Sequence, residues 1–187
     1  ALLGNTELYE KVFPSSQEKS PEQQNNCLEY LMLRSFGRPR DLISFLKVYQ
    51  KQYKNDLFFN FSNFDKCLRS YSHGFYIEIV NEINLNPYKK DVLSTIEVIK
   101  KMQKRYFKFN DLQTFYTQYK DIYSWNIASI NKSCIDLYQL GVIGSCTRYP
   151  GKKKNTYWFS YRDGSPKEPD MNKEFAVHFA LLNSFSL

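Results

Sequence analysis

The sequence predicts a mostly α-helical α+β protein, in which a helical bundle is followed by a winged helix-turn-helix domain with a β-hairpin wing. Apolar residues recur at helical spacing through most of the first 87 residues. After Asn86-Pro87, three more helix-like segments lead into two strand-like runs, VIGSCTRY and NTYWFSYR. With 187 residues, 42% of them hydrophobic, the chain is long enough for two small domains. We expect a helical domain over residues 1–87 and a winged-helix domain over residues 88–187.

Capping signals divide the first half into helices. Ser20-Pro21 has the form of an N-cap residue followed by proline at the first helical position. The stretch SNFD, from Ser62, is typical of a capping box, with Asp in place of the usual Glu or Gln. The expected elements are a short segment at 6–13 and helices from Pro21 to about Ser35, from Pro39 to about Tyr53 and from Ser62 to about Ile83.

The second half changes pattern after Pro87. The expected elements are helices over 89–104, 110–119 and 126–140 and strands over 142–149 and 155–162. The basic turn PGKKK, Pro150 to Lys154, joins the two strands. Three helices and a hairpin follow each other in the order of a winged helix-turn-helix. The third helix then takes the recognition position and PGKKK the tip of the wing.

Two arginines stand at the start of the helix predicted from Pro39. Pro39 suits the first helical position, and Asp41 complements the positive end of the helix dipole. Arg38 and Arg40 oppose that dipole, at a cost of a few tenths up to about 1 kcal/mol each. They suit a bound phosphate, because a helix N-terminus presents free N–H groups and arginine adds bidentate hydrogen bonds. The alternative is that Arg40 pairs with a carboxylate such as Asp41 or with another helix.

Four stretches of the chain carry a family resemblance. RSFGRPRDLISFL, from Arg34, resembles the start of the small helical lid in bacterial P-loop ATPases of the AAA/STAND type, often described as DNA-repair or antiphage ATPases. LYQLGVIG, YWFSYRDG and VHFALLNSFSL are similar to the winged helix and C-terminal tail of that family. The resemblance implies a lid-like role for residues 1–87. It also implies that Arg38 or Arg40 is the "sensor 2" residue, which reaches the γ-phosphate of ATP.

The chain departs from such an ATPase in one large respect. The stretch that comes nearest to a Walker A loop, Gly144 to Lys152, has six residues between its glycines instead of four, and Lys153 stands where Ser or Thr would bind magnesium. A βαβ pattern is also missing from the sequence. The resemblance therefore implies a non-catalytic C-terminal accessory region whose partner is an upstream ATPase domain. ATP and magnesium would bind in that parent protein, and we expect no cofactor or metal site in this chain.

Positive charge is concentrated in the second half. Residues 1–87 contain ten Lys plus Arg against ten Asp plus Glu, whereas residues 88–187 contain sixteen against nine. Uniform codon bias does not explain this asymmetry, which favours an acidic partner such as double-stranded DNA. The candidate DNA-binding residues are Arg148, Lys152, Lys153, Lys154 and Arg162 around the wing and Lys132 on the third helix. The alternative is that the lysines form a solvated turn that keeps the hairpin from aggregating.

The remaining features bear on compartment and partners. Cys27, Cys67, Cys134 and Cys146 have no metal-ligand spacing, which predicts a reduced, cytoplasmic protein. No apolar run approaches the ~20 residues of a membrane span, and the sequence does not open with a signal peptide. A free-standing DNA-binding winged helix is one alternative function. A protein-interaction module or oligomer, built on the aromatic run FFNFSNF at 58–64, is the other.

Overall fold

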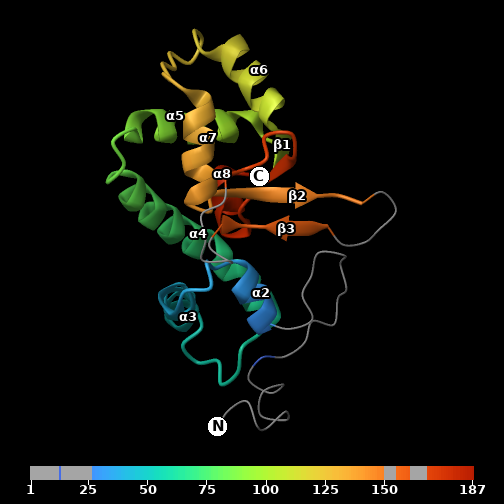
Figure 1. The fold of residues 1–187 in the computed structure, drawn as a ribbon. Helices are drawn as coiled ribbons and strands as arrows, with labels where there is room; N and C mark the ends of the chain where they lie inside the picture. The colour runs from blue at the N-terminus through green and yellow to red at the C-terminus, as the bar shows by residue number, and fades with distance from the viewer. Residues whose placement is uncertain (1–12, 14–26, 150–154, 161–167) are drawn as a thin grey trace. The chain divides into compact units, whose positions relative to one another are not determined.

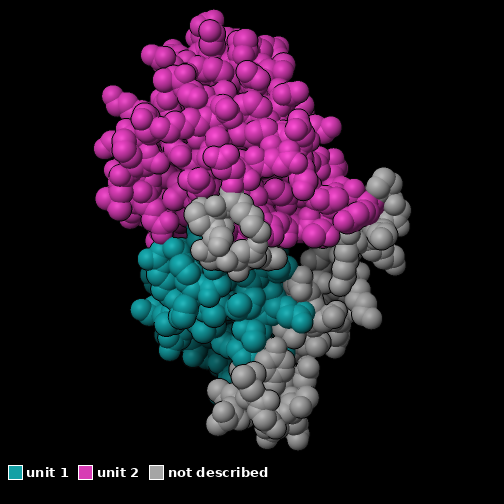
Figure 2. Space-filling model, in the orientation of Figure 1, with its two compact units in different colours: residues 1–72 teal, residues 73–187 magenta. Residues whose placement is uncertain are grey.

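The computed structural model describes Phe13 and residues 27–149, 155–160 and 168–187 (Figure 1). These residues form two compact units, unit 1 (residues 1–72) and unit 2 (residues 73–187), which are coloured separately in Figure 2. The described part of the chain is mostly α-helical with one small antiparallel sheet, which confirms the predicted mostly α-helical α+β class.

The boundary between the units falls inside helix α4 (Phe61–Ile83), whereas the sequence predicts it after Pro87. The second half of α4 carries side chains that belong to the core of unit 2. Phe75 stacks on His178, with ring centroids 5.7 Å apart, and Tyr76 meets the edge of Phe185. Packing therefore divides the chain within a helix, where no turn signal marks the division.

Unit 1 contains α2 (Cys27–Leu33), α3 (Pro39–Gln52) and the first half of α4. Pro39 begins α3 as predicted, and the helix ends one residue short of the predicted Tyr53. The core is aromatic: the ring of Phe45 lies 4.9 Å from that of Phe64 and 5.1 Å from that of Tyr71. Apart from Phe13, the predicted segment at 6–13 and the predicted cap at Ser20-Pro21 lie outside the described residues.

Unit 2 begins with the second half of α4 and continues through three further helices. These are α5 (Lys89–Met102), α6 (Phe109–Tyr119) and α7 (Ile130–Gln139). The predicted start of the last helix at Asn126 is wrong. Ser129 has an extended backbone and its hydroxyl accepts a hydrogen bond from the Lys132 N–H, so it caps the helix at Ile130.

The sheet of unit 2 has four antiparallel strands in the order β1-β4-β2-β3. They are β1 (Tyr106–Lys108), β2 (Ile143–Thr147), β3 (Thr156–Trp158) and β4 (Glu174–Val177). The predicted pairing of the two strand-like runs is present between β2 and β3, with Ser145 opposite Trp158. Strands β1 and β4 were not predicted. The chain ends in a 3-10 turn, η3 (Phe179–Leu181), and α8 (Leu182–Phe185).

A glycine is required where the sheet is most crowded. A Cβ on Gly144, in β2, would lie 2.5 Å from the Phe159 ring and 2.5 Å from the Trp158 carbonyl oxygen. Gly144 therefore serves close packing between β2 and the segment after β3.

Candidate functional site

A buried carboxylate organises the start of α3. Asp41, at the third helical position, is 1% exposed. Its Oδ2 atom accepts hydrogen bonds from the Phe36 backbone N–H at 2.9 Å and from Nε of Arg38 at 3.2 Å. A buried carboxylate is stable only with such partners, because burial removes its hydration. Asp41 thus ties the loop before the helix to the helix itself.

Both predicted nucleotide-binding arginines lie around this carboxylate. Nε of Arg40 is 3.8 Å from Oδ1 of Asp41, and the Arg38 guanidinium also lies over the Phe36 ring, 4.8 Å from its centroid. The Arg38 side chain is 30% exposed and that of Arg40 is 55% exposed. Both cations lie beside one buried anion, which offsets their repulsion from the positive end of the helix dipole. Pairing with Asp41 explains why this arrangement is stable.

The described candidates for DNA contact are engaged within unit 2. The ammonium group of Lys132 lies over the Tyr88 ring, 3.2 Å from its centroid. Arg148 makes a two-pronged ion pair with Glu174 and lies over the Tyr106 ring. Lys152, Lys153, Lys154 and Arg162 fall outside the described residues. The two cations that are described therefore contribute to internal packing as well as to surface charge.

The outward face of α7 is short of charge. Asn131 and Gln139 are exposed, while Ser133 is buried and donates from its hydroxyl to the Ser129 carbonyl. Asp136 accepts a hydrogen bond from the Asn86 side chain at 3.3 Å. Exposed Asn and Gln are able to read adenine, but one lysine beside an aspartate is little charge for groove binding.

The basic stretch at the end of α5 also packs on aromatic rings. Lys100 donates to Glu97 at 2.8 Å and to the Tyr76 hydroxyl at 3.1 Å. Lys101 lies over Tyr123. Arg105 lies over two rings, those of Tyr106 and Phe179. Part of the positive charge of the second half therefore contributes to its own packing.

The cysteines and the buried histidine are core residues. All four cysteines are free and buried. Burial raises the pKa of the Cys27 and Cys134 thiols to about 12 and that of Cys67 to about 11, so their thiolates do not form near neutral pH. His178 is fully buried, and its Nδ1 atom accepts from the Ala180 N–H. Among the described residues, no three His, Cys, Asp or Glu side chains gather as a metal site would need. The helices described here are too short or too polar to cross a bilayer.

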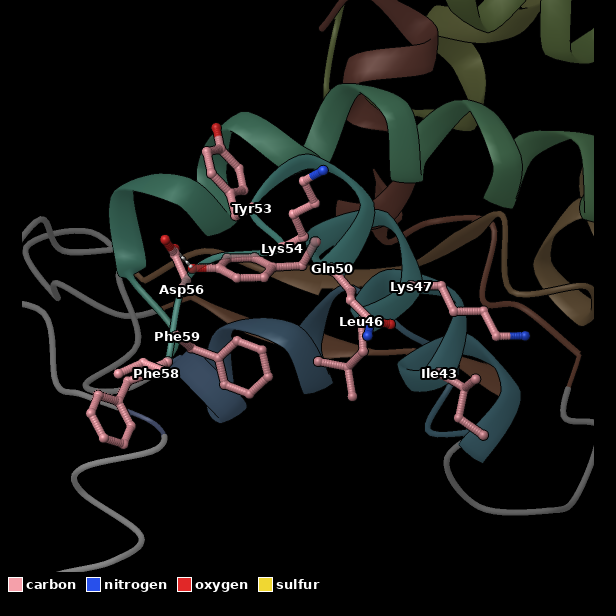
Figure 3. A pocket seen from close by; sticks show the side chains of 11 residues that line it. Ile43, Leu46, Lys47, Gln50, Tyr53, Lys54, Asp56, Phe58 and Phe59 are labelled. Atoms are coloured by element: carbon pink, nitrogen blue, oxygen red, sulfur yellow. Dashed lines mark hydrogen bonds between the residues drawn. The ribbon is translucent and has the colours of Figure 1, made fainter.

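Sequence analysis did not identify a groove on unit 1. It has a volume of about 450 Å³ and runs along α3 and the loop that follows it. In Figure 3, Phe58 and Phe59 lie at one end of the groove and Ile43 and Lys47 at the other. Three of its apolar side chains are exposed to solvent: Ile43 (51%), Leu57 (88%) and Phe58 (44%). The aromatic run at 58–64 was the only sequence signal for it, and it did not say which rings face outward.

Hydrogen bonds hold the loop beside the groove in place. The Tyr49 hydroxyl donates to the Asp56 carboxylate at 2.6 Å and accepts from the Asn60 N–H at 2.9 Å. The Asn63 side chain donates to the same carboxylate at 2.9 Å. Burial and the Asp56 hydrogen bond raise the pKa of Tyr49 to about 12, so the hydroxyl stays protonated as this network requires. The groove is therefore bounded by a loop with a defined conformation.

Comparison with known proteins identifies no relative. No protein-family model, no curated protein and no solved structure matches the chain. What the protein does has to be inferred from its own residues.

Proposed function

We propose that this chain is a non-catalytic accessory region of a P-loop ATPase, in which unit 1 is the helical lid and unit 2 a winged helix. The order of elements in unit 2 carries the proposal: α5, β1, α6, α7, then β2 and β4. Strand β4 pairs with β2 on one side and with β1 on the other. A winged helix has this order and this pairing: its second wing strand lies between the first wing strand and the short strand that precedes its second helix.

Strand β3 is then an addition to the wing. It pairs with the outer edge of β2, through Thr156, Tyr157 and Trp158. On this interpretation the wing is the hairpin β2–β4, and the basic turn at 150–154 lies within a long excursion between its two strands. The predicted wing, formed from β2 and β3 alone, is the part of the sequence-based hypothesis that this proposal changes.

Arg40 is the better candidate to reach a nucleotide phosphate in the parent protein. Its side chain is 55% exposed and stands 3.8 Å from the shared carboxylate, whereas the Nε of Arg38 is hydrogen-bonded to that carboxylate at 3.2 Å. Arg38 and Asp41 would then act as positioning residues for the helix start. Phosphate binding by Arg40 at a helix N-terminus would add charge-assisted hydrogen bonds.

The test of the nucleotide role uses the longer protein, once its coding sequence has been read upstream of Ala1. We expect a G-x-x-x-x-G-K-[ST] loop there and ATP turnover that falls by at least about 10²-fold in Arg40→Ala. Arg69→Ala is the matched control, because Arg69 is an exposed arginine on α4 of the same unit. A coding sequence without a phosphate-binding loop, or turnover equal in the two variants, would reject this function.

DNA contact by unit 2 is the second candidate, favoured by the winged-helix order and by exposed Asn131 and Gln139 on α7. It predicts duplex binding that weakens steeply with salt and is lost when Lys152, Lys153 and Lys154 are all replaced by Glu. Lys132→Ala should have a smaller effect, since that ammonium group already lies over Tyr88. Absence of duplex binding at low salt would exclude this candidate.

A further inference from the structure

One residue that lines the groove of unit 1 is in contact with Phe13, a residue near the start of the chain. The ring of Phe13 stacks on that of Phe59, with centroids 5.2 Å apart and planes inclined by 27°. Phe59 is one of the groove-lining residues, and its ring also meets Tyr49 and Phe64 edge-on. Phe13 therefore contacts the groove at the end of the loop that joins α3 to α4.

We propose that the groove is the docking site of the segment Thr6 to Phe13 of this same chain. Docking would cover the exposed Ile43, Leu57 and Phe58, and removing such side chains from water is favourable. The proposal does not depend on the ATPase or DNA roles, because it rests on the groove-lining residues and on the contact of Phe13 with Phe59.

The pattern of the segment matches an apolar groove. Its sequence is TELYEKVF, in which Leu8 and Val12, and likewise Tyr9 and Phe13, are four residues apart. Residues at this spacing share one face when a segment is helical, the usual way an amphipathic segment enters a groove. Phe13 supplies the anchor that is already in contact with Phe59.

Charge is also complementary. The segment contributes Glu7 and Glu10 against the single Lys11, and the groove contributes the exposed Lys47 and Lys54. The carboxylate of Asp56, the acidic residue that lines the groove, is occupied by hydrogen bonds from Tyr49 and Asn63. Apolar burial would supply most of the affinity, and the charge pairs would favour one register over others.

Proximity in the full chain is the direct test. Val12→Cys and Leu57→Cys introduce two thiols, which a short bismaleimide can join. The native thiols do not compete, because all four are buried. The comparison pair is Val12→Cys with Leu85→Cys, since Leu85 is 87% exposed, as Leu57 is 88% exposed, but belongs to unit 2.

We expect intramolecular cross-linking of the Leu57 pair to be at least about tenfold faster than that of the Leu85 pair, because docking raises the effective concentration. Adding Phe13→Ala should remove most of that advantage, and Phe13→Leu should restore part of it. Lys47→Glu with Lys54→Glu should slow the reaction at low salt without unfolding the protein, since both lysines are exposed.

Two outcomes would overturn the proposal. The proposal fails if the two cysteine pairs cross-link at equal rates, or if the rate of the Leu57 pair does not change in Phe13→Ala. Either result would mean that the segment meets the surface only by random collision. Cross-linked dimers in place of intramolecular products would show that the groove takes the segment of a second copy. The thermal unfolding midpoint of each variant, compared with the parent, identifies any variant that has lost its fold.

Discussion

The two units differ in the polar contacts that recur in each, although both also place an arginine over an aromatic ring. In unit 1, tyrosine hydroxyls bind carboxylates: Tyr30 donates to Asp65 at 2.7 Å and Tyr49 to Asp56 at 2.6 Å. In unit 2, cations lie over aromatic rings, as Lys132 does over Tyr88 and Arg105 over Phe179. The difference teaches that net charge alone is a poor guide to a binding face. Unit 2 uses part of its positive charge in packing, whereas unit 1, with ten Lys plus Arg against eight Asp plus Glu, has an open groove flanked by lysines.

The largest expected loss of stability comes from removing a buried aromatic ring from the core of one unit at a time. Phe45→Ala in unit 1 and Phe175→Ala in unit 2 each remove a fully buried ring, which should cost about 3–5 kcal/mol of unfolding free energy. Trp125 and Trp158 both lie in unit 2, so tryptophan fluorescence reports that unit, while far-UV circular dichroism reports all helices. We expect Phe175→Ala to shift the fluorescence transition in urea and Phe45→Ala to shift mainly the dichroism transition. Equal shifts of both signals in both variants would mean that the units unfold as one.

The next effect contrasts two carboxylates. Asp41→Ala should lose about 2–4 kcal/mol, because the Phe36 N–H and two guanidinium groups lose a buried acceptor. Asp136→Ala in unit 2 should lose about 1 kcal/mol or less, since only the 3.3 Å hydrogen bond from Asn86 is removed. Urea titration at neutral pH measures both. Similar losses would show that Asp41 does not organise the helix start, and Asp41→Asn should fall between the two.

Alkaline pH should weaken both units through buried thiols. The pKa of Cys27 in unit 1 and of Cys134 in unit 2 is raised from 9.0 to about 12, because burial disfavours the thiolate. A raised folded-state pKa contributes stability that is fully present below pH 9 and is lost as pH rises toward 12. Replacing either thiol by Ala should reduce the loss between pH 8 and pH 11 by about 2–3 kcal/mol, measured by urea unfolding at the two pH values. An unchanged loss in both variants would assign the alkaline effect to other groups.

The smallest effect compares two cations on rings. The Arg34 guanidinium lies 3.5 Å from the Tyr30 ring centroid in unit 1, and Lys132 lies 3.2 Å from the Tyr88 centroid in unit 2. Double-mutant cycles should give coupling energies of about 0.5–1 kcal/mol for each, with the larger value for Tyr30. Tyr30 is 3% exposed and Tyr88 is 50% exposed, so water weakens the second pair more. A coupling energy of zero between Lys132 and Tyr88 would show that Tyr88 does not hold this ammonium group, and Lys132 would again be a full candidate for DNA contact.

Most helices could be predicted because their signals are local. Pro39 begins α3, a capping-type start places α4 near Ser62, and Gly141, with φ of 75°, follows the end of α7. Strands β1 and β4 could not be predicted, because β1 has three residues and β4 is buried along most of its length, so neither shows a clear alternation. Their pairing comes from residues far apart, as in Phe107 opposite Phe175.

The candidate sites show the same distinction between local sequence signals and long-range packing. Sequence alone identified Arg38, Arg40 and Asp41 as a set, since position relative to the helix start decides which side chains meet there. The tertiary structure decided that both arginines share one buried carboxylate, that Lys132 and Arg148 face internal partners, and that unit 1 carries a groove. Those outcomes depend on which side chains are brought together by long-range packing. Spacing along the chain carries no information about them, because a ring or carboxylate that captures a cation can come from any part of the sequence.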